Sequence, residues 1–411
     1  MAEFHIPLNI PDVEIVSQRT NDKGEFVLKI KSTKTYTGCH KCGKPATMHY
    51  GTAPQITIRH LPVFDTPVYL VITPVRYKCD DCGATTTEQY DWRKEGKDIT
   101  TGLSDYLLRR TVNSTVEDVG RKEHISVKTV VGIIDDRIGS EIDWNDFKSL
   151  GILGIDEISL KKGHADYVTV ISTKNGENGE LSILSVLDGR LKETVKEFLR
   201  TIPVELRRTI KTVCTDMYDG YVNAVTETLG KQVLVVDRFH VAKLYREPLD
   251  KLRTQEMARL KTELSVEEYG KLEGIMWILR QKHECLDKAD KEKLALLYKH
   301  SPLLKQAHSY ALQLTHIFNT HCSRKSAMAK LDRWLSKIKT FNVTCYKNFC
   351  KTLEKYKPYI GNYFKERRSS GFVEGLNNRI KVIKRRCYGI FNPVTLFQRL
   401  YLDLQGARIY E

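Results

Sequence analysis

The chain has 411 residues, of which 41% are hydrophobic and 28% are charged. This composition is typical of a folded globular protein with two to four domains. It argues against a membrane protein, because no apolar run approaches the roughly 18 residues that a transmembrane helix needs. Residues Met1 to Pro11 lack the basic start and apolar stretch of a signal peptide, so we expect a cytoplasmic protein.

Lys and Arg outnumber Asp and Glu by 66 to 51, which leaves a net charge of +15. This excess favours a polyanionic partner such as DNA, because phosphates neutralised by basic side chains release condensed counterions. A basic protein without a nucleic-acid partner would have the same charge balance. The ten cysteines are not expected to form disulfides in the cytoplasm.

Composition divides the chain into five regions. Residues 1–95 are rich in β-branched residues, Pro and Gly, and residues 98–148 have the pattern of short helices. Residues 150–240 alternate apolar, strand-like runs with helical stretches, as an α/β unit does. Residues 241–365 are expected to be all-helical, and residues 366–411 are mixed in pattern and strongly basic.

The first region contains two C-x-x-C-G motifs, Cys39-His-Lys-Cys42-Gly43 and Cys79-Asp-Asp-Cys82-Gly83. Two residues between the cysteines allow both sulfurs to face one ion, and the glycine permits the tight turn that follows. Four thiolates at this spacing predict a closed, tetrahedral site for a structural Zn²⁺ ion. Two unrelated thiol pairs, or a redox pair, are the alternatives.

The second region predicts a helix-turn-helix between Ser114 and Asp136. A short helix would pack through Val116, Val119 and Gly120. Ser126 is a natural N-cap for a second helix, whose inner face we expect to be formed by Val127, Val130, Ile133 and Ile134. Lys128 and Thr129, at the start of this helix, are then candidate DNA-binding residues, although helical pairs of this kind also occur without any DNA contact.

The third region contains five candidate strands and two candidate helices. The strands are expected at Gly151–Ile155, Tyr167–Ser172, Ser182–Leu187, Ile210–Thr215 and Val233–Val236, and the helices at Leu191–Leu199 and Tyr218–Leu229. Acidic residues follow three of these strands. Asp156 follows the first, Asp216 the fourth and Asp237 the fifth.

The carboxyl ends of strands in an open α/β sheet are where functional sites gather. Asp156 and Asp216 would therefore lie together and could hold Mg²⁺ or Mn²⁺ through their carboxylate oxygens. A third acid, Glu374, enters a C-terminal helix. Each acid alone could equally be a helix cap or a turn residue. Asp237 is expected to be an N-cap or a support for the metal site, and His240 to contact DNA or to pack in the core.

Basic side chains surround the helix that carries Glu374, and beside a metal-binding acid we expect them to track DNA phosphates. They are Arg379, Lys381, Lys384, Arg385 and Arg386. A solvated helix face is the alternative explanation for such a run. In the helical region, Trp277 and Trp334 are expected to be core residues.

The order of these blocks resembles that of the ISL3 family of bacterial insertion-sequence transposases. The resemblance extends from about Cys39 to Leu400 and is clearest at Asp237–His240 (DRFH) and at Gly371–Gly389 (GFVEGLNNRIKVIKRRCYG). It implies an RNase H-like catalytic core with a DDE carboxylate triad and an all-helical insertion between its second and third acids. The matching positions are Asp156, Asp216 and Glu374, and residues 241–365 would form the insertion.

The sequence therefore predicts an α/β protein with an RNase H-like core and an all-helical insertion, preceded by a zinc module and a helix-turn-helix. The expected function is a DNA transposase that binds the terminal inverted repeats of its element and then cuts and joins DNA with two Mg²⁺ or Mn²⁺ ions. Because two ends must be joined, we expect a homodimer or a higher oligomer on double-stranded DNA, and no membrane partner. A non-cutting DNA-binding regulator and an RNase H-like nuclease or resolvase without strand transfer are the alternatives.

Overall fold

The computed structural model describes residues 7–160, 167–175, 178–231, 233–341, 343–367 and 371–406. The chain forms two compact units. The first unit contains residues Met1–Ser140, Arg386–Tyr388 and Gln398–Glu411, and the second contains Glu141–Arg385 and Gly389–Phe397. None of the helices within these described ranges is long and apolar enough to cross a membrane.

The first unit opens with short strands arranged in three small sheets. Their strand orders are β1-β2-β7-β6, β3-β4 and β5-β8-β9. The strands are β1 (Val13–Thr20), β2 (Phe26–Ser32), β3 (Thr37–Gly38), β4 (Pro45–Ala46), β5 (Met48–Thr52), β6 (Ile56–Val63), β7 (Thr66–Ile72), β8 (Val75–Lys78) and β9 (Thr85–Thr87). The four-stranded sheet has its own small core, in which Ile58, Leu70 and Ile72 are almost fully buried.

Three helices follow, α1 (Thr101–Thr111), α2 (Val116–Lys122) and α3 (Val127–Arg137). The predicted N-cap is confirmed, since the Ser126 hydroxyl accepts a hydrogen bond from the backbone N–H of Thr129. Val130, Ile133 and Ile134 are buried as expected. The prediction for Val127 is wrong, because this side chain is 40% exposed. It lies against Gly120, which has no side chain to cover it.

The end of the chain completes the packing of these helices. Helix α15 (Pro393–Tyr401) continues into the π-helical turn η4 (Leu402–Gly406). Gln398 donates hydrogen bonds to the Asp135 carboxylate and to the backbone carbonyl of Ile138. The fully buried Asp403 carboxylate pairs with Arg386 and accepts a hydrogen bond from the backbone N–H of Asn113. The first unit is therefore built from both ends of the sequence.

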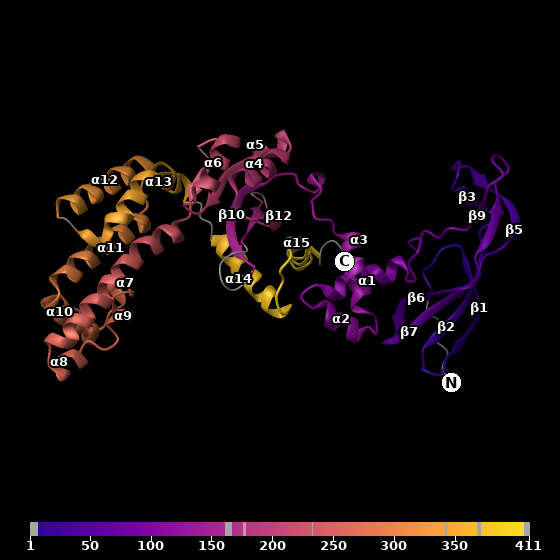
Figure 1. The fold of residues 1–411 in the computed structure, drawn as a ribbon, viewed down its shortest axis with the longest axis horizontal. Helices are drawn as coiled ribbons and strands as arrows, with labels where there is room; N and C mark the ends of the chain where they lie inside the picture. Colours follow the sequence, from indigo (N-terminus) through magenta and orange to yellow (C-terminus); the bar gives the residue numbers. More distant parts are fainter. Residues whose placement is uncertain are drawn as a thin grey trace. The chain divides into compact units, whose positions relative to one another are not determined.

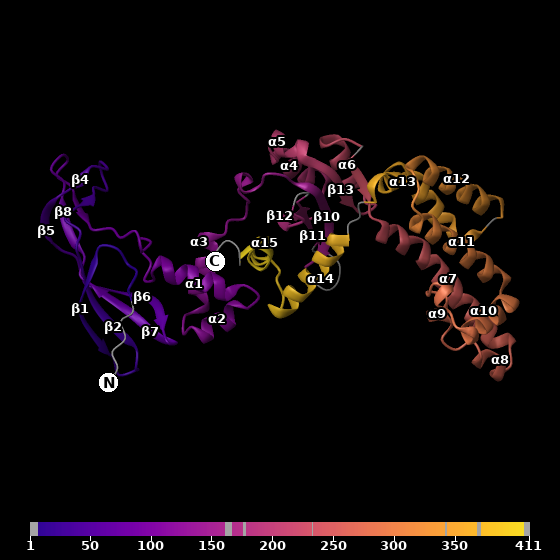
Figure 2. The same ribbon diagram turned by 180° about the vertical axis from the view of Figure 1, so that it is seen from behind.

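The second unit contains a five-stranded sheet with the order β12-β11-β10-β13-β14. Strands β10, β11 and β12 are antiparallel neighbours, and β13 and β14 run parallel to β10. The elements up to the last strand are η1 (Trp144–Asp146), β10 (Gly151–Ser159), β11 (Tyr167–Lys174), β12 (Leu181–Asp188), α4 (Lys192–Thr201), α5 (Val204–Thr209), β13 (Ile210–Thr215), α6 (Asp219–Thr228) and β14 (Leu234–Val236). Figures 1 and 2 show α4, α5 and α6 on one side of this sheet.

All five expected strands are present, with two differences from the prediction. Strand β10 continues to Ser159, which pairs with Tyr167 of β11, so Asp156 lies within the strand and does not follow its end. The added length comes from pairing with β11, a partner that the local sequence does not reveal. The short helix α5 between α4 and β13 was not predicted.

A helical insertion separates β14 from the last part of this unit. It contains α7 (Arg238–Glu263), α8 (Val266–Gly270), α9 (Ile275–Ile278), η2 (His283–Cys285), α10 (Lys288–His300), α11 (Pro302–Asn319), α12 (Arg324–Thr340), η3 (Thr344–Tyr346) and α13 (Lys347–Glu366). Its core includes Trp334, which is 2% exposed. Trp277, by contrast, is 63% exposed, and its prediction as a core residue is wrong. Ile275 and Ile278 take the inward face of the short helix α9 and leave Trp277 outside.

Helix α14 (Gly371–Arg386) returns the chain to the sheet, on the side opposite α4, α5 and α6 (Figures 1 and 2). It packs very closely against β10 at Gly154. A Cβ atom at this glycine would lie 2.4 Å from Cγ2 of Val373 and 3.1 Å from Cζ of Phe372. The absence of a side chain at Gly154 is therefore what allows α14 to lie against β10.

We expect Gly154→Ala to lower the free energy of unfolding by about 1–3 kcal/mol, because the added methyl group forces α14 away from β10. Gly375→Ala is the matched control. Gly375 lies on α14, and a Cβ atom at this position would meet no atom within 4 Å. Alanine at this position should therefore stabilise the helix by roughly 0.5–1 kcal/mol. Thermal and denaturant unfolding of both variants check this. Equal stabilities for the two variants would contradict the close packing at Gly154.

Candidate active site and metal centre

The four paired cysteines come together in the first unit. In both C-x-x-C-G motifs, the backbone N–H of the glycine donates to the carbonyl of the first cysteine, at 2.9 Å each. Gly43 and Gly83 have positive φ angles of 73° and 71°. A side chain would strain this left-handed conformation, which explains the glycine at the same place in each motif.

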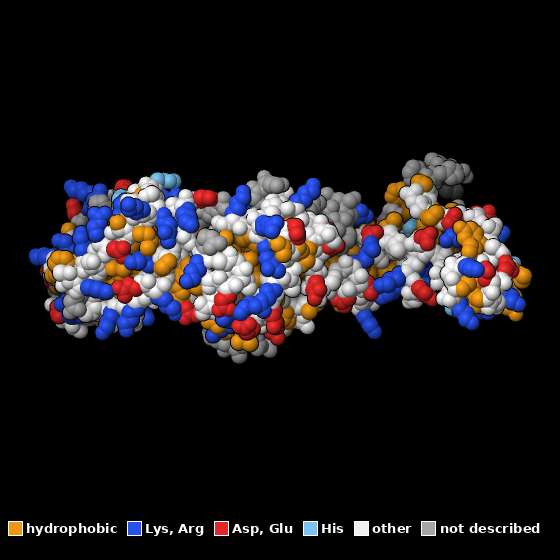
Figure 3. Space-filling model, turned by 90° about the horizontal axis from the view of Figure 1, so that it is seen from above, with side chains coloured by type: hydrophobic (Ala, Val, Ile, Leu, Met, Phe, Trp, Pro, Cys, Tyr) orange, Lys and Arg blue, Asp and Glu red, His pale blue; other side chains and the backbone are white. Residues whose placement is uncertain are grey.

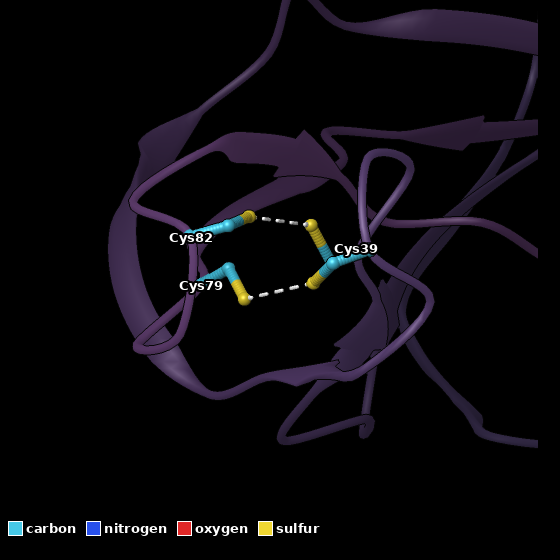
Figure 4. A group of neighbouring side chains, drawn as sticks. Cys39, Cys79 and Cys82 are labelled. Atoms are coloured by element: carbon cyan, nitrogen blue, oxygen red, sulfur yellow. Dashed lines mark hydrogen bonds between the residues drawn. The ribbon is translucent and has the colours of Figure 1, made fainter.

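The sulfur geometry fits one tetrahedral ion (Figure 4). The Cys39 and Cys82 sulfurs lie 3.5 Å apart, those of Cys42 and Cys79 lie 3.6 Å apart, and the four ligand atoms all lie within 4.8 Å of one another. A zinc ion with Zn–S bonds of about 2.3 Å requires sulfur separations of about 3.8 Å. Backbone N–H groups of Cys42 and Lys41 lower the pKa of the Cys39 thiol to about 6, which favours the thiolate that a metal binds. These cysteines form a site for a structural zinc ion.

Three aspartates occupy equivalent positions on the parallel strands of the second unit. In the register of the sheet, Ile155 of β10 pairs with Thr215 of β13, and Thr215 pairs with Val236 of β14. The next residues along these strands are Asp156, Asp216 and Asp237. The sheet therefore sets the three carboxylates side by side in one row across neighbouring strands.

Burial and neighbouring charges change the acidity of the middle carboxylate. Burial, the largest cause, and the negative charges of Asp156 and Glu157 raise the pKa of Asp216, whose net value is about 6. His240 and the backbone N–H of Tyr218 act in the opposite direction. A second positive charge beside Asp216 would stabilise its ionised form, which is the form that binds a divalent cation.

The outer members of the site have their own partners. Asp237 caps α7 by accepting a hydrogen bond of 2.9 Å from the backbone N–H of Phe239, so its predicted N-cap role is confirmed. Its other carboxylate oxygen lies 3.6 Å from Nδ1 of His240. Glu157, next to Asp156 in the sequence, pairs with Arg190 at 3.2 Å.

Helix α14 brings a fourth group to this row. Asn377 donates a side-chain hydrogen bond to the Asp156 carboxylate, and Val373, one turn earlier, contacts the position of Gly154. Glu374 lies in the first turn of the same helix, three residues before Asn377, and is exposed. Residues three apart on a helix are neighbours on its surface, so Glu374 lies one turn from the residue that contacts Asp156.

Among the described residues, the four cysteines form the only group of three or more His, Cys, Asp or Glu residues close enough to hold one metal ion. Asp156 and Asp216 lie on paired strands, and Glu374 lies on the helix that covers β10. The role of these three acids is taken up below as a proposal.

Asn377 was not among the site residues predicted from the sequence. The available signal was the position of Asn377 one turn after Glu374. When a helix contains one site residue, the residue three positions later lies next to it on the helix surface. The Asn377 carboxamide oxygen is buried without a hydrogen-bond partner among the described groups. The Asn377 amide group thus orients one oxygen of Asp156, and the Asn377 carboxamide oxygen remains an unused acceptor in the same side chain.

Two of the five basic residues of α14 that were expected to bind DNA, Lys384 and Arg386, are partly buried in contacts that hold the fold together. The Lys384 ammonium donates to the backbone carbonyls of Ser159 and Leu160, at 2.7 and 2.9 Å, and burial lowers its pKa. Arg386 pairs with the buried Asp403. Arg379, Lys381 and Arg385 are exposed. Lys384 therefore holds α14 to the end of β10, and Arg386 stabilises the first unit.

The two residues expected to read DNA lie in the first turn of α3. Lys128 is exposed, and the Thr129 hydroxyl lies 2.7 Å from that of Ser126. His124, in the turn before α3, has a positive φ of 53°, which directs the chain from α2 sharply into α3. The start of α3 is accessible to a partner.

Comparison with known proteins defines the class of the chain. Residues 153–400 match a family model described as a transposase, and residues 35–82 match a model described as the zinc finger of transposase IS204/IS1001/IS1096/IS1165. The chain belongs to the ISL3 family of transposases.

Two curated relatives agree with this assignment. The transposase for insertion sequence element IS1001 of Bordetella parapertussis is 27% identical over 381 residues, covering 92% of this chain and 91% of the relative. The transposase for IS1557 of Mycobacterium tuberculosis is 23% identical and covers 97% and 93%. The Drosophila P element transposase strand transfer complex has a TM-score of 0.39 and 13% identity over 75% of this chain and 92% of that chain, which is too weak to establish a shared fold.

We expect Cys39→Ser to reduce the bound zinc from one ion per chain to almost none, because three thiolates no longer complete the tetrahedral shell. Cys285→Ser is the control, since Cys285 is exposed and lies outside the cluster. Metal analysis of the purified variants by mass spectrometry measures the difference. An unchanged zinc content in Cys39→Ser would contradict the four-cysteine site.

The raised pKa of Asp216 predicts a dependence of stability on pH. Because the folded-state pKa of about 6 lies above the ordinary value of 3.8, the charged carboxylate destabilises the folded chain above pH 6. In Mg²⁺-free buffer, Asp216→Asn should therefore raise the free energy of unfolding at pH 7.5, by up to about 3 kcal/mol. The gain should shrink as the pH falls from 6 to 4, where the wild-type carboxyl is protonated.

Thermal unfolding of Asp216→Asn at pH 7.5 and pH 4 tests this expectation. Asp188→Asn is the matched control, because Asp188 is exposed on β12 of the same sheet. The control should change stability little at either pH. A loss of stability in Asp216→Asn at pH 7.5 would show that the charged carboxylate does not destabilise the folded chain.

Proposed function

We propose that this transposase binds the terminal inverted repeats of its own element and uses Asp156, Asp216 and Glu374 to cut and join DNA. The observation that carries the proposal is the register of the sheet. Asp156 and Asp216 directly follow paired residues of β10 and β13, and α14, the helix that carries Glu374, packs against β10 at Gly154. Family membership is consistent with this triad at the same three positions.

We propose an RNase H-like core for the second unit. Three antiparallel strands followed by two parallel strands, in the order β12-β11-β10-β13-β14, support it. The helical insertion then lies between the second and third acids, from α7 to α13. Residues 150–240 and those parts of 366–411 that belong to the second unit would share the core, whereas Gln398–Glu411 belongs to the first unit. Residues 98–148 would form a helix-turn-helix with Lys128 and Thr129 facing DNA.

The three carboxylates are a suitable donor set for Mg²⁺ or Mn²⁺, which prefer oxygen ligands. Two such ions supply charge that activates an attacking hydroxyl and stabilises the departing 3′ oxygen. Asn377 orients Asp156 by its hydrogen bond, and the partly buried setting of Asp216 strengthens its attraction for a cation. Asp237 and His240 adjoin Asp216 and would hold its surroundings in place.

The remaining parts of the chain would then recognise and position the DNA. The zinc-binding segment and α3 would find the inverted repeats, and Arg379, Lys381 and Arg385 would contact phosphates next to Glu374. Joining two ends requires two active sites, so the working assembly would be a dimer or a higher oligomer on DNA.

We expect Asp156→Asn, Asp216→Asn and Glu374→Gln each to reduce DNA cleavage by a factor of about 10³ or more, because each removes a charged metal ligand. Binding to DNA that carries the inverted repeats should remain within about twofold. Asp188→Asn, on the same sheet, should cleave at the wild-type rate. Cleavage is measured on labelled DNA with Mg²⁺ or Mn²⁺, and binding by gel shift.

Each possible result of this experiment has a distinct meaning. Normal cleavage by one triad variant would remove that residue from the proposed site. Specific binding without metal-dependent nicking by the wild-type chain would favour a DNA-binding regulator. Nicking without joined products would favour a nuclease or resolvase.

A further inference from the structure

A groove lies between α11 and α12 in the helical insertion, far along the sequence from the acids of the site. Its volume is about 520 Å³. It is lined by Ser309, Leu312, Gln313, His316 and Ile317 of α11 and by Lys330, Arg333, Trp334 and Lys337 of α12. No Asp or Glu is among these lining residues.

The floor of the groove is rigid. The Trp334 ring is buried, and its indole N–H donates a hydrogen bond of 2.9 Å to the backbone carbonyl of Tyr310. Trp334 also packs edge-on against Tyr310 and Tyr346. Because these contacts fix the spacing of α11 and α12, the groove is a permanent feature of the insertion.

Three basic side chains follow one edge of this groove. Arg333 follows Lys330 by three residues and Lys337 follows it by seven, so the three side chains share one face of α12. Other lysines nearby are paired with acids, as in Lys339 with Glu354 and Lys357 with Asp332. Among the described residues, no Asp or Glu forms an ion pair with Lys330, Arg333 or Lys337.

The surrounding helical hairpin has the same charge. From Pro302 to Thr340 its basic residues outnumber its single acid, Asp332, by seven to one. The basic residues are Lys305, Arg324, Lys325, Lys330, Arg333, Lys337 and Lys339. The space-filling view in Figure 3 shows Lys and Arg side chains gathered over the helical insertion at its left end. A field of one sign over a groove attracts a polyanion.

The spacing of the three side chains suits a nucleic-acid backbone. Seven residues of α-helix rise about 10 Å, which matches roughly three phosphates of one DNA strand at about 3.4 Å of axis each. The groove also offers the Ser309 hydroxyl and the Gln313 carboxamide as neutral hydrogen-bond donors. Such donors often contact phosphate and sugar oxygens.

We propose that the α11–α12 groove binds the phosphate backbone of duplex DNA, through Lys330, Arg333 and Lys337, as a contact surface separate from the carboxylate site and from α3. This rests on the proposed function, in which the chain holds DNA while it cuts and joins. The contact is independent of base sequence, because it involves phosphates and no base edges. The helical insertion thereby adds affinity for DNA and no specificity.

The test uses the full-length chain with two triple variants of equal charge change. Lys330→Gln, Arg333→Gln and Lys337→Gln are combined in the groove variant. Lys288→Gln, Lys291→Gln and Lys299→Gln are combined in the control, because these residues are exposed on α10, in the same insertion but outside the groove. Circular dichroism and thermal unfolding establish that both variants fold.

Binding to an inverted-repeat duplex and to an unrelated duplex is measured between 50 and 300 mM salt, a range over which the Debye length falls from about 14 to about 6 Å. For the groove variant we expect the slope of log K against log salt to decrease by about 2–3, at about 0.9 per lost phosphate contact. Both duplexes should be weakened by the same factor, on the order of tenfold or more. The control variant should keep the wild-type slope.

Two results would overturn the inference. Equal slopes for the groove and control variants would show that the groove carries no phosphate contact, even where the wild-type chain cuts DNA normally. A loss confined to the inverted-repeat duplex would show that the groove reads sequence. Failure of the wild-type chain to cut DNA, with the groove variant still losing its salt slope, would instead contradict the proposed function and leave the groove assignment supported.

Discussion

The proposed carboxylate site of this transposase depends on the contact between α14 and β10 at Gly154. The two elements are separated by more than two hundred residues of sequence, as the hydrogen bond between Asn377 and Asp156 illustrates. A glycine on the strand lets the helix approach until Val373 and Phe372 occupy the space of the missing side chain. Lys384 then secures the far end of the helix to the carbonyls at the end of β10. Apolar packing at one end and charge-assisted hydrogen bonds at the other fix where Glu374 lies.

This arrangement concentrates negative charge in a partly buried place, which opposes folding. The raised pKa of Asp216 reflects this unfavourable charge, to which the neighbouring carboxylates of Asp156 and Glu157 contribute. Apolar packing of the sheet offsets this unfavourable free energy, and Leu153, Ile155 and Val213 are almost fully buried in it. Groups held at unfavourable charge or conformation gather at functional sites, where the strain is relieved by the partner that binds there.

Local patterns predicted the elements well and their long-range contacts poorly. The apolar run Ile210–Thr215 forms a strand with the bounds expected, and Ser126 caps α3, because both depend on neighbouring residues. Strand β10 is longer than expected because β11 pairs with its last residues. The burial of Lys384 and the exposure of Trp277 also depend on contacts that sequence spacing does not contain.

The candidate site divides in the same way. Asp156 and Asp216 could be placed together from strand order, since parallel neighbours in register carry their next residues to one row. Glu374 could be assigned only by resemblance, because its place follows from the packing of α14. Asn377 was missed because a carboxamide on a basic helix has no distinctive pattern before its partner is known.

The use of both chain ends in the first unit has a consequence for how the protein is made. Gln398 bonds to Asp135 across a separation of 263 residues, and Asp403 bonds to Asn113 across 290. During synthesis, α1, α2 and α3 therefore leave the ribosome long before the residues that complete their packing. Domains often fold as they emerge, but this one must wait until the intervening core and insertion have been translated. A nascent or interrupted chain would thus present α1, α2 and α3 without the residues that complete their packing, so that the first unit is complete only after the second has been translated.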